Sequence, residues 1–453
     1  MRGGLPSGTA VTFAVAFAIA LTVYLAAWPD APFQDGDSPQ YLAVARDLAD
    51  GRLDTLHDRT PGYPALLVLT GSAEQPSRWL VVVSLLLHFV SIWLLARLLH
   101  AAGVARAWML AFGVALLLPP FVEPVAYVMT ENLAQTALVV GLFALVHGHT
   151  TGRVGWTLAA SAAFALGALT RPAYQALGFV LAVCVLVAAR GATRDDGATR
   201  RAWTSAVALA LGFAVLVGAY ASFNKRRFGY FGVTFSIGFH LSTKTMGFVE
   251  RLPDEHAVVR EILIRERDRQ LTQRGGYHTT TQTIWSVRDE LQAATGLSRP
   301  KLARHLLRLN LFLIGKAPLE YLQEVARSAA VYWFPAATRP ASFGARVFRW
   351  AWVALHAGVV LMLFLHLVGL AGLGLIRVSF GSAGAGGAAV LCPTALQALA
   401  YTLAGAIVFY TMALSCLLDI GDPRQRRPTD VLIVFMCVLG AHVWHRARRE
   451  RLG

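Results

Sequence analysis

Residues 8–41 read GTAVTFAVAFAIALTVYLAAWPDAPFQDGDSPQY and decide the fold. The first part, 8–29, is almost purely apolar, and a membrane-spanning helix needs about 20 such residues. The stretch 30–41 follows at once and carries three acidic residues. Because carboxylates are costly to keep next to lipid, we expect a spanning helix that opens directly into a polar site at one membrane face.

Two further polar segments stand out from the apolar background. The sequence RTPGYP at 59–64 comes about twenty residues later, and MTENL at 129–133 opens a later apolar run. The prolines and the glycine of the first segment are typical of a rigid turn. Three polar segments at the same face predict a site that carries out chemistry there.

The composition places the chain among polytopic membrane proteins. Hydrophobic residues make up 56% of the 453 residues and charged residues only 15%, whereas soluble domains carry about 25% charged residues. The net charge is +15, but the Lys and Arg residues lie mostly in short loops between apolar runs, where they set membrane orientation. Nucleic acid is therefore not an expected partner, and the bilayer is.

The apolar runs predict about ten transmembrane helices, the first of them a retained anchor. Basic residues in the loops place both termini in the cytoplasm, and the Ala, Gly and Arg bias favours a bacterial cytoplasmic (inner) membrane. We expect an all-α protein with a transmembrane catalytic module at 1–222, a small and mostly helical periplasmic domain at 223–348, and C-terminal transmembrane helices at 349–453. The predicted spans are 8–29, 79–99, 105–120, 129–147, 155–170, 174–190, 202–222, 349–376, 396–417 and 429–445.

The acidic candidates lie in the first outer loop, 30–78, and at the start of the fourth span. Residues 38–50 have a Ser at the N-cap and a Pro at the first helical position, which predicts a juxtamembrane helix just after Asp35 and Asp37. Either carboxylate suits a general base toward an acceptor hydroxyl or a ligand of a divalent cation. The structural alternative is an exposed loop that caps the helix. For Glu131 the alternative is a carboxylate favoured by the helix dipole.

The basic candidates are arginines and a lysine that break the positive-inside trend. An Arg fork donates two parallel hydrogen bonds to a phosphate, so a lipid phosphate that belongs to the substrate would explain them, and contact with ordinary phospholipid is the alternative. Tyr63 suits an interface anchor, and Arg59 suits a phosphate or a carboxylate partner. The candidate phosphate-binding residues are Arg424, Arg426, Arg427, Arg171 and Arg59, with Tyr41, Tyr63 and Lys225 as candidate substrate contacts.

Several other chemistries have no support in the sequence. We find no HExxH zinc motif, no Walker A loop, no GxSxG elbow and no dinucleotide fingerprint. The histidines do not cluster, so we predict no metal site from them and no required cofactor. His240 and His256 of the outer domain remain loose candidates for a metal or an acceptor contact.

Taken together, the polar segments resemble the GT-C superfamily of integral membrane glycosyltransferases, in particular the bacterial branch related to protein O-mannosyltransferases and lipid A aminoarabinose transferases. The resemblance implies a polyprenyl-phosphate sugar donor, an active site at the outer face, an inverting transfer for which a metal is optional, and Asp37 as the catalytic carboxylate. Asp35, one glycine away, leaves the identity of the base open. The matching residues are Asp37 with Tyr41, then 59–64, 130–133, 170–172 and 422–428.

The resemblance therefore implies transfer of a sugar from a polyprenyl-phosphate-linked donor to the hydroxyl of a glycan, lipid or protein acceptor. Glu131 would orient the acceptor or the sugar. A lipid-linked sugar flippase or transporter is the alternative, although charges near span centres or paired broken helices, which transporters show, are not evident. A scaffold protein is a third possibility, but it would not need the three polar segments.

Overall fold

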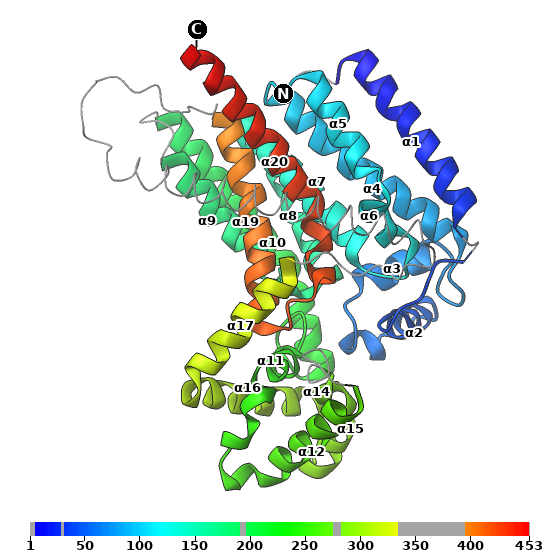
Figure 1. Cartoon of the computed structure of the whole chain (residues 1–453), viewed down its shortest axis with the longest axis vertical. Coiled ribbons are helices and arrows are strands. Elements are labelled where there is room, and N and C mark those ends of the chain that lie inside the picture. The colour runs from blue at the N-terminus through cyan, green and yellow to red at the C-terminus, as the bar shows by residue number, and fades with distance from the viewer. Residues whose placement is uncertain (1–4, 29–30, 191–195, 275–281, 334–394, 453) are drawn as a thin grey trace. The chain divides into compact units, whose positions relative to one another are not determined.

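The protein is an all-α polytopic membrane protein (Figure 1). The computed structural model describes residues 5–28, 31–190, 196–274, 282–333 and 395–452. Within these ranges no strand forms, and the single extended pairing is an isolated parallel bridge between Phe33 and Tyr127.

Six helices are long and apolar enough to cross a membrane, and a seventh span results if a helix pair bent by 62° is counted as one. That pair is α5 (Arg106–Leu116) followed by α6 (Pro119–Val122) and the 3-10 turn η2 (Glu123–Ala126), and Pro119 marks the bend, as expected of proline. The six are α1 (Ser7–Ala27), α4 (Arg78–Ala101), α7 (Glu131–Thr151), α10 (Asp196–Phe228), α19 (Ala395–Leu418) and α20 (Pro423–Leu452).

Two shorter apolar helices, α8 (Val154–Thr170) and α9 (Leu177–Arg190), fall where spans were also predicted. The predicted count of ten transmembrane helices is not confirmed, because α8, α9 and α5 are shorter than the six helices that are long enough to cross a membrane. The span predicted at 349–376 lies outside the described residues.

The chain forms two compact units. Unit 1 comprises the described parts of Met1–Gly218, Ala337–Tyr410 and Arg427–Gly453, and unit 2 comprises the described parts of Ala219–Ala336 and Thr411–Arg426. The unit boundaries fall inside α10, α19 and α20, so each of these helices continues from one unit into the other.

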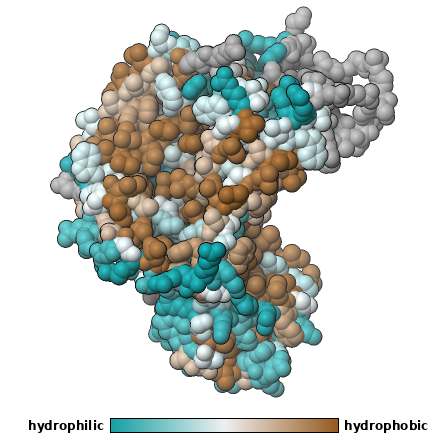
Figure 2. All heavy atoms as spheres, turned by 180° about the vertical axis from the view of Figure 1, so that it is seen from behind, coloured by the Kyte–Doolittle hydropathy of each residue, from teal (hydrophilic) through white to brown (hydrophobic). Residues whose placement is uncertain are grey.

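Unit 1 is organised around α7. In α7, 78% of the most apolar stretch of the helix is buried inside the protein, against neighbours that include α4 and α8. In α1, only 6% of the corresponding stretch is buried. Hydrophobic side chains that are not covered by protein require a lipid environment, and Figure 2 shows a broad area of them over the helices of unit 1. The loop between α1 and α4 holds three short elements: α2 (Ser38–Ala49), η1 (Asp54–His57) and α3 (Gly62–Leu69).

Unit 2 has a hydrophobic core of its own, built from amphipathic helices that follow α10. Its helices are α11 (Ile237–Thr245), η4 (Met246–Arg251), η5 (Asp254–His256), α12 (Ala257–Arg274), α14 (Thr283–Ser286), α15 (Arg288–Thr295), α16 (Arg299–Lys316) and α17 (Pro318–Trp333).

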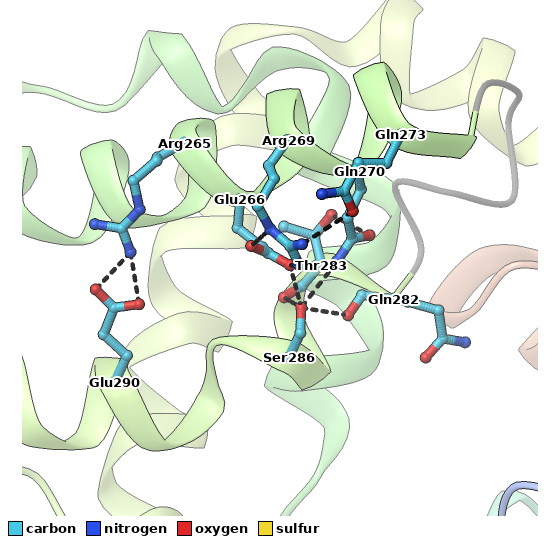
Figure 3. Close-up of polar contacts among 9 residues, drawn as sticks. All are labelled: Arg265, Glu266, Arg269, Gln270, Gln273, Gln282, Thr283, Ser286 and Glu290. Atoms are coloured by element: carbon cyan, nitrogen blue, oxygen red, sulfur yellow. Dashed lines mark hydrogen bonds and ion pairs between the residues drawn. The ribbon is translucent and has the colours of Figure 1, made fainter.

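A polar network joins α12 to α14 beside this core (Figure 3). Glu266 accepts hydrogen bonds from Arg269 at 2.6 Å, from Gln270 at 2.6 Å and from Ser286 at 2.9 Å. The Arg269 guanidinium above all lowers the pKa of Glu266 to about 2, against the effect of burial. The network therefore keeps Glu266 ionised and fixes the two helices to each other.

Lys244 is a fully buried lysine of α11, with 1% of its surface exposed. Its ammonium group donates to the Ser328 hydroxyl and, at 3.4 Å, to the Glu324 carbonyl oxygen. Burial lowers the pKa of Lys244 from 10.5 to about 8, although nearby acidic groups raise it in part. Because the folded pKa lies below the unfolded one, the charge costs stability below pH 8, and stability rises between pH 8 and 10.5.

We therefore expect Lys244→Met to raise the free energy of unfolding at neutral pH by about 2–3 kcal/mol. The variant should also lose the rise in stability above pH 8. Unfolding of the detergent-solubilised protein by heat, followed at several pH values, measures both effects. A variant less stable than wild type at pH 7 would mean that the bonds to Ser328 and Glu324 outweigh the cost of burying the charge.

Candidate functional site

The segment that follows α1 lies alongside the segment that precedes α7. The Phe33 N–H donates to the Ala126 carbonyl oxygen at 2.8 Å, and the Val128 N–H donates to the Phe33 carbonyl oxygen at 2.9 Å. The Ser38 hydroxyl then accepts from the Asp35 N–H at 2.8 Å and donates to the Val128 carbonyl oxygen at 2.9 Å. Two polar segments ninety residues apart in the sequence are thereby fixed side by side.

This arrangement corrects the predicted start of the short helix. Asp37, not Ser38, occupies the N-cap position of α2, and its side chain makes no capping hydrogen bond. The Ser38 hydroxyl serves the bridge to Val128 instead. The structural alternative for Asp37, a carboxylate that caps the helix, therefore does not describe its contacts.

Asp37 is paired with Arg59. Its carboxylate accepts from the Arg59 guanidinium at 2.6 Å, and the same guanidinium donates to the Gln40 side-chain oxygen at 2.9 Å. The guanidinium also lies over the Tyr41 ring, 4.7 Å from its centroid. About a third of the Asp37 side chain remains exposed, at 33%. Of the two partners that the sequence allowed for Arg59, the structure shows a carboxylate.

Tyr41 and Tyr63 are the buried aromatic residues of this cluster. Both are buried, with 7% and 2% exposure, and their rings meet edge to face at 5.3 Å. The Tyr63 hydroxyl is hydrogen-bonded to the backbone of Met129. Burial raises the pKa of both tyrosines, and the charge of Glu131 raises both further. The two phenols therefore stay neutral and connect the Asp37 end of the cluster to Glu131.

Glu131 begins α7 and is 2% exposed. Its carboxylate lies 3.4 Å from the guanidinium of Arg171, whose side chain is 16% exposed. Arg171 directly follows α8 and is held in an extended conformation. A buried carboxylate needs such a partner, so the pair fixes the end of α8 against the start of α7.

The segment 59–64, predicted as a rigid turn, begins α3 at Gly62 and packs directly on the end of α8. The Thr60 hydroxyl donates to the Thr170 carbonyl oxygen at 3.4 Å. A Cβ atom on Gly62 would come 2.6 Å from the Thr170 hydroxyl and 2.8 Å from the Leu169 carbonyl oxygen. Only glycine fits this approach, which brings Arg59 and Arg171 to one region of unit 1.

We therefore expect Gly62→Ala to lower the free energy of unfolding by about 1–3 kcal/mol, because the backbone of α8 must shift. Gly155→Ala, in α8 itself, is the control, since a Cβ there meets nothing within 4 Å. Thermal unfolding in detergent compares the two. Equal unfolding temperatures for both variants would show that Gly62 does not pack against the end of α8.

Six of the predicted site residues thus gather in one cluster of unit 1, and the others lie outside this cluster. Asp35 is exposed, and its carboxylate accepts from the Gly36 N–H at 2.8 Å. Arg427, also in unit 1, lies 3.7 Å from Glu123. The gathered residues are Asp37, Tyr41, Arg59, Tyr63, Glu131 and Arg171.

The remaining candidates belong to unit 2. Arg426 is 2% exposed, donates to the Tyr332 carbonyl oxygen, and lies about 6 Å from the centroids of two aromatic rings. The backbone N–H of Arg424 donates to the Asp422 carboxylate at 2.7 Å, at the start of α20. Lys225 is exposed near the end of α10.

Comparison with solved structures identifies the architecture. Archaeal oligosaccharyltransferase AglB from Archaeoglobus fulgidus, in complex with an inhibitory peptide and a dolichol-phosphate, is similar over 99% of this chain, with a TM-score of 0.53 and 12% sequence identity. At this identity the likeness shows a shared fold, that of the matched part of AglB. The chain spans about half of AglB, 52% of that chain.

Two structures of ArnT from Cupriavidus metallidurans, one bound to undecaprenyl phosphate and one in the apo state, also match. Their TM-scores are 0.38 and 0.34, with 16% and 18% identity, over 98% and 97% of this chain and 78% of theirs. No family model matches the sequence, and no curated protein matches it.

A divalent cation is one of the options that the sequence leaves open for the acidic loop at 30–78. Among the described residues, no group of three or more His, Cys, Asp or Glu side chains is placed to hold a metal. The Asp37 carboxylate already faces the positive charge of Arg59 at 2.6 Å. We therefore derive no step through a metal.

Sequence reasoning missed three contributors to the site region. Gln40 holds the Arg59 guanidinium, Ser38 bridges to Val128, and Glu123 faces Arg427. A signal existed for Glu123, because an acidic residue that follows two prolines inside an apolar run marks a break in a span. No signal marked Gln40, and Ser38 was noted only as a helix N-cap, because both roles depend on contacts between distant segments.

Proposed function

We propose that this chain is a glycosyltransferase that moves a sugar from a polyprenyl-phosphate-linked donor to an acceptor hydroxyl at the outer face of a bacterial cytoplasmic membrane. One observation carries the proposal: a partly exposed carboxylate, Asp37, and a buried ion pair, Glu131 with Arg171, are brought into one cluster at the ends of membrane helices. The GT-C fold and the dolichol-phosphate bound to AglB support it.

In the proposed reaction, Asp37 acts as the general base. Its carboxylate takes the proton of the acceptor hydroxyl while the acceptor oxygen forms a bond to the anomeric carbon. The bond from that carbon to the phosphate oxygen breaks, and the phosphate leaves with the electron pair. Arg59 holds Asp37 in place at 2.6 Å, and Asp35 is the alternative base.

The leaving phosphate needs positive charge beside it. Arg171 is a cation of the cluster, and its side chain is 16% exposed. Stabilising the negative charge that develops on a leaving group is a large contribution to catalysis. Arg427, also in unit 1, is the second proposed phosphate contact, and a phosphate contact by Arg424 stays a prediction from the sequence. Arg426 already donates to the Tyr332 carbonyl oxygen, so we propose that it stabilises the packing of unit 2 and does not bind the phosphate.

The substrate contacts follow from the same cluster. Glu131 orients Arg171 and the sugar. Tyr41 and Tyr63 are proposed to contact the substrate through their aromatic rings. A substrate contact by Lys225, which belongs to unit 2, stays a prediction from the sequence. The acceptor class remains a hydroxyl of a glycan, a lipid or a protein, with both chain termini in the cytoplasm.

The experiment that tests this function follows a labelled sugar in proteoliposomes that contain the purified chain. Polyprenyl-phosphate carrying a radiolabelled sugar is supplied together with a membrane extract as a source of acceptors. A transferase moves the label from the lipid onto an acceptor. A flippase moves intact labelled lipid between leaflets and leaves the sugar-phosphate bond unbroken, and that outcome would contradict the proposal.

A further inference from the structure

The helical path of the chain is interrupted directly after α8, at Arg171. Helix α8 ends at Thr170, the 3-10 turn η3 (Pro172–Tyr174) follows, and α9 begins at Leu177. Pro172 lacks a backbone N–H, and its ring disfavours the helical conformation at the preceding residue. Arg171 accordingly has extended torsion angles, with φ −134° and ψ 110°. The direction in which the Arg171 side chain leaves the backbone is therefore set by this break.

A tyrosine from a distant helix bonds the backbone groups at the break. In a regular helix the Pro172 carbonyl oxygen would accept from the Ala176 N–H, but here it accepts from the Gln175 N–H at 3.0 Å. The Ala176 N–H donates instead to the hydroxyl of Tyr410, on α19, at 3.2 Å. The same hydroxyl donates to the Ala173 carbonyl oxygen at 2.7 Å. Because a hydroxyl both donates and accepts, one side chain satisfies two backbone groups of the break.

The bonds from Tyr410 matter because the break lies between two apolar helices, α8 and α9. Backbone N–H and C=O groups that lack a partner are costly where water is scarce. Tyr410 belongs to unit 1, as do both helices, although it lies 237 residues from Ala173 in the sequence. The hydroxyl thus links α19 to the turn that follows Arg171.

The turn is bonded to Arg171 itself. The Tyr174 N–H donates to the Arg171 carbonyl oxygen at 3.0 Å, and the Tyr174 side chain is buried, with 1% exposure. The Arg171 guanidinium lies 3.4 Å from Glu131. A group that takes part in catalysis has to be held within about 0.5 Å of its productive position. A loosened turn would shift the backbone from which this guanidinium projects.

We propose that Tyr410 is a positioning residue for Arg171. Its hydroxyl holds the turn at 172–176 and thereby sets the place of the Arg171 guanidinium. Tyr410 acts through these backbone bonds, and no contact with the substrate is assigned to it. The proposal rests on the proposed function, in which Arg171 stabilises the leaving phosphate, and adds to that site a residue from α19.

Hydrogen–deuterium exchange tests whether Tyr410 holds the turn, without an activity assay. In detergent, amides of peptides that cover 172–180 are expected to exchange about five- to tenfold faster in Tyr410→Phe than in wild type, the effect of one lost hydrogen bond. Tyr401→Phe is the matched control, because Tyr401 lies in the same helix, near Cys437 of α20. It should leave these peptides at the wild-type rate. Unchanged exchange in Tyr410→Phe, or an acceleration that is equally large in α4, would contradict a local hold on the turn.

The kinetics of sugar transfer separate a positioning role from a purely structural one. Per folded protein, Tyr410→Phe is expected to lower kcat about tenfold with KM within about twofold, because Arg171 acts on charge that develops as the phosphate leaves. In an Arg171→Lys background the same change should lower kcat less than about threefold. A lysine ammonium lies on a flexible stem, so its place depends less on the backbone.

Two kinetic results would contradict the positioning of Arg171 by Tyr410. One is faster exchange of the turn with unchanged kcat, and the other is an equal loss of kcat in the wild-type and Arg171→Lys backgrounds. Absence of transfer by the wild-type chain would refute the proposed function and with it the role of Arg171. The exchange experiment would still show in that case whether Tyr410 holds the turn.

Discussion

Replacement of Asp37 by asparagine is expected to reduce sugar transfer by about 10²- to 10⁴-fold, the range that removal of a general base produces. The asparagine amide keeps the size of the side chain and can still contact Arg59, but it cannot take the proton of the acceptor hydroxyl. Initial rates of label transfer in proteoliposomes, normalised to protein level, give the measurement.

The matched control for this variant is Asp50→Asn at the other end of α2. Asp50 is 53% exposed and pairs with Arg52 at 2.8 Å, outside the cluster. Its replacement should leave transfer within about twofold, because exposed ion pairs contribute little. Asp35→Asn is measured in parallel. If it abolishes transfer while Asp37→Asn does not, the base is Asp35, and unchanged transfer in both variants would contradict the acidic loop as the site.

Replacement of Arg171 by alanine is expected to lower the free energy of unfolding by about 3 kcal/mol. The substitution leaves the Glu131 carboxylate, which is 2% exposed, without the guanidinium that lies 3.4 Å away. Removing one partner of a buried ion pair leaves an uncompensated charge and costs about 3–5 kcal/mol, and the partial exposure of Arg171 favours the lower end. Thermal unfolding in detergent measures the loss.

A second variant separates stability from function at this pair. Arg171→Met combined with Glu131→Gln removes both charges, so stability should return to within about 1 kcal/mol of wild type. Sugar transfer should stay low, because Arg171, the cation proposed to stabilise the leaving phosphate, has been removed. Recovery of transfer together with stability would show that the pair has a structural role only.

Much of the candidate site could be predicted from the sequence because its residues interrupt apolar runs. Carboxylates and arginines at the ends of spans are costly in a membrane, so Asp37, Glu131 and Arg171 stood out without any contact information. The short helix after Asp37 was also predictable from its proline and its apolar periodicity, although its N-cap lies one residue earlier than predicted.

What could not be predicted depends on contacts between distant segments. Nothing in the sequence indicated that the segment after α1 would pair with the segment before α7, because one isolated bridge leaves no strand pattern. The choice of a carboxylate as the partner of Arg59 likewise depends on a tertiary contact, the one between Arg59 and Asp37. Arg426 was a candidate phosphate ligand because it breaks the positive-inside trend, whereas its burial against Tyr332 arises from the packing of unit 2.

Photo-crosslinking with a donor lipid tests the central claim most directly. A polyprenyl-phosphate sugar that carries a photoreactive group on the sugar is bound to the wild-type chain, irradiated, and mapped by peptide mass spectrometry. We predict adducts on peptides from 31–64, from 123–133 and from 169–175, and their loss in the Arg171→Met, Glu131→Gln double variant. Transfer activity together with adducts confined to other parts of the chain would contradict the assignment of the site.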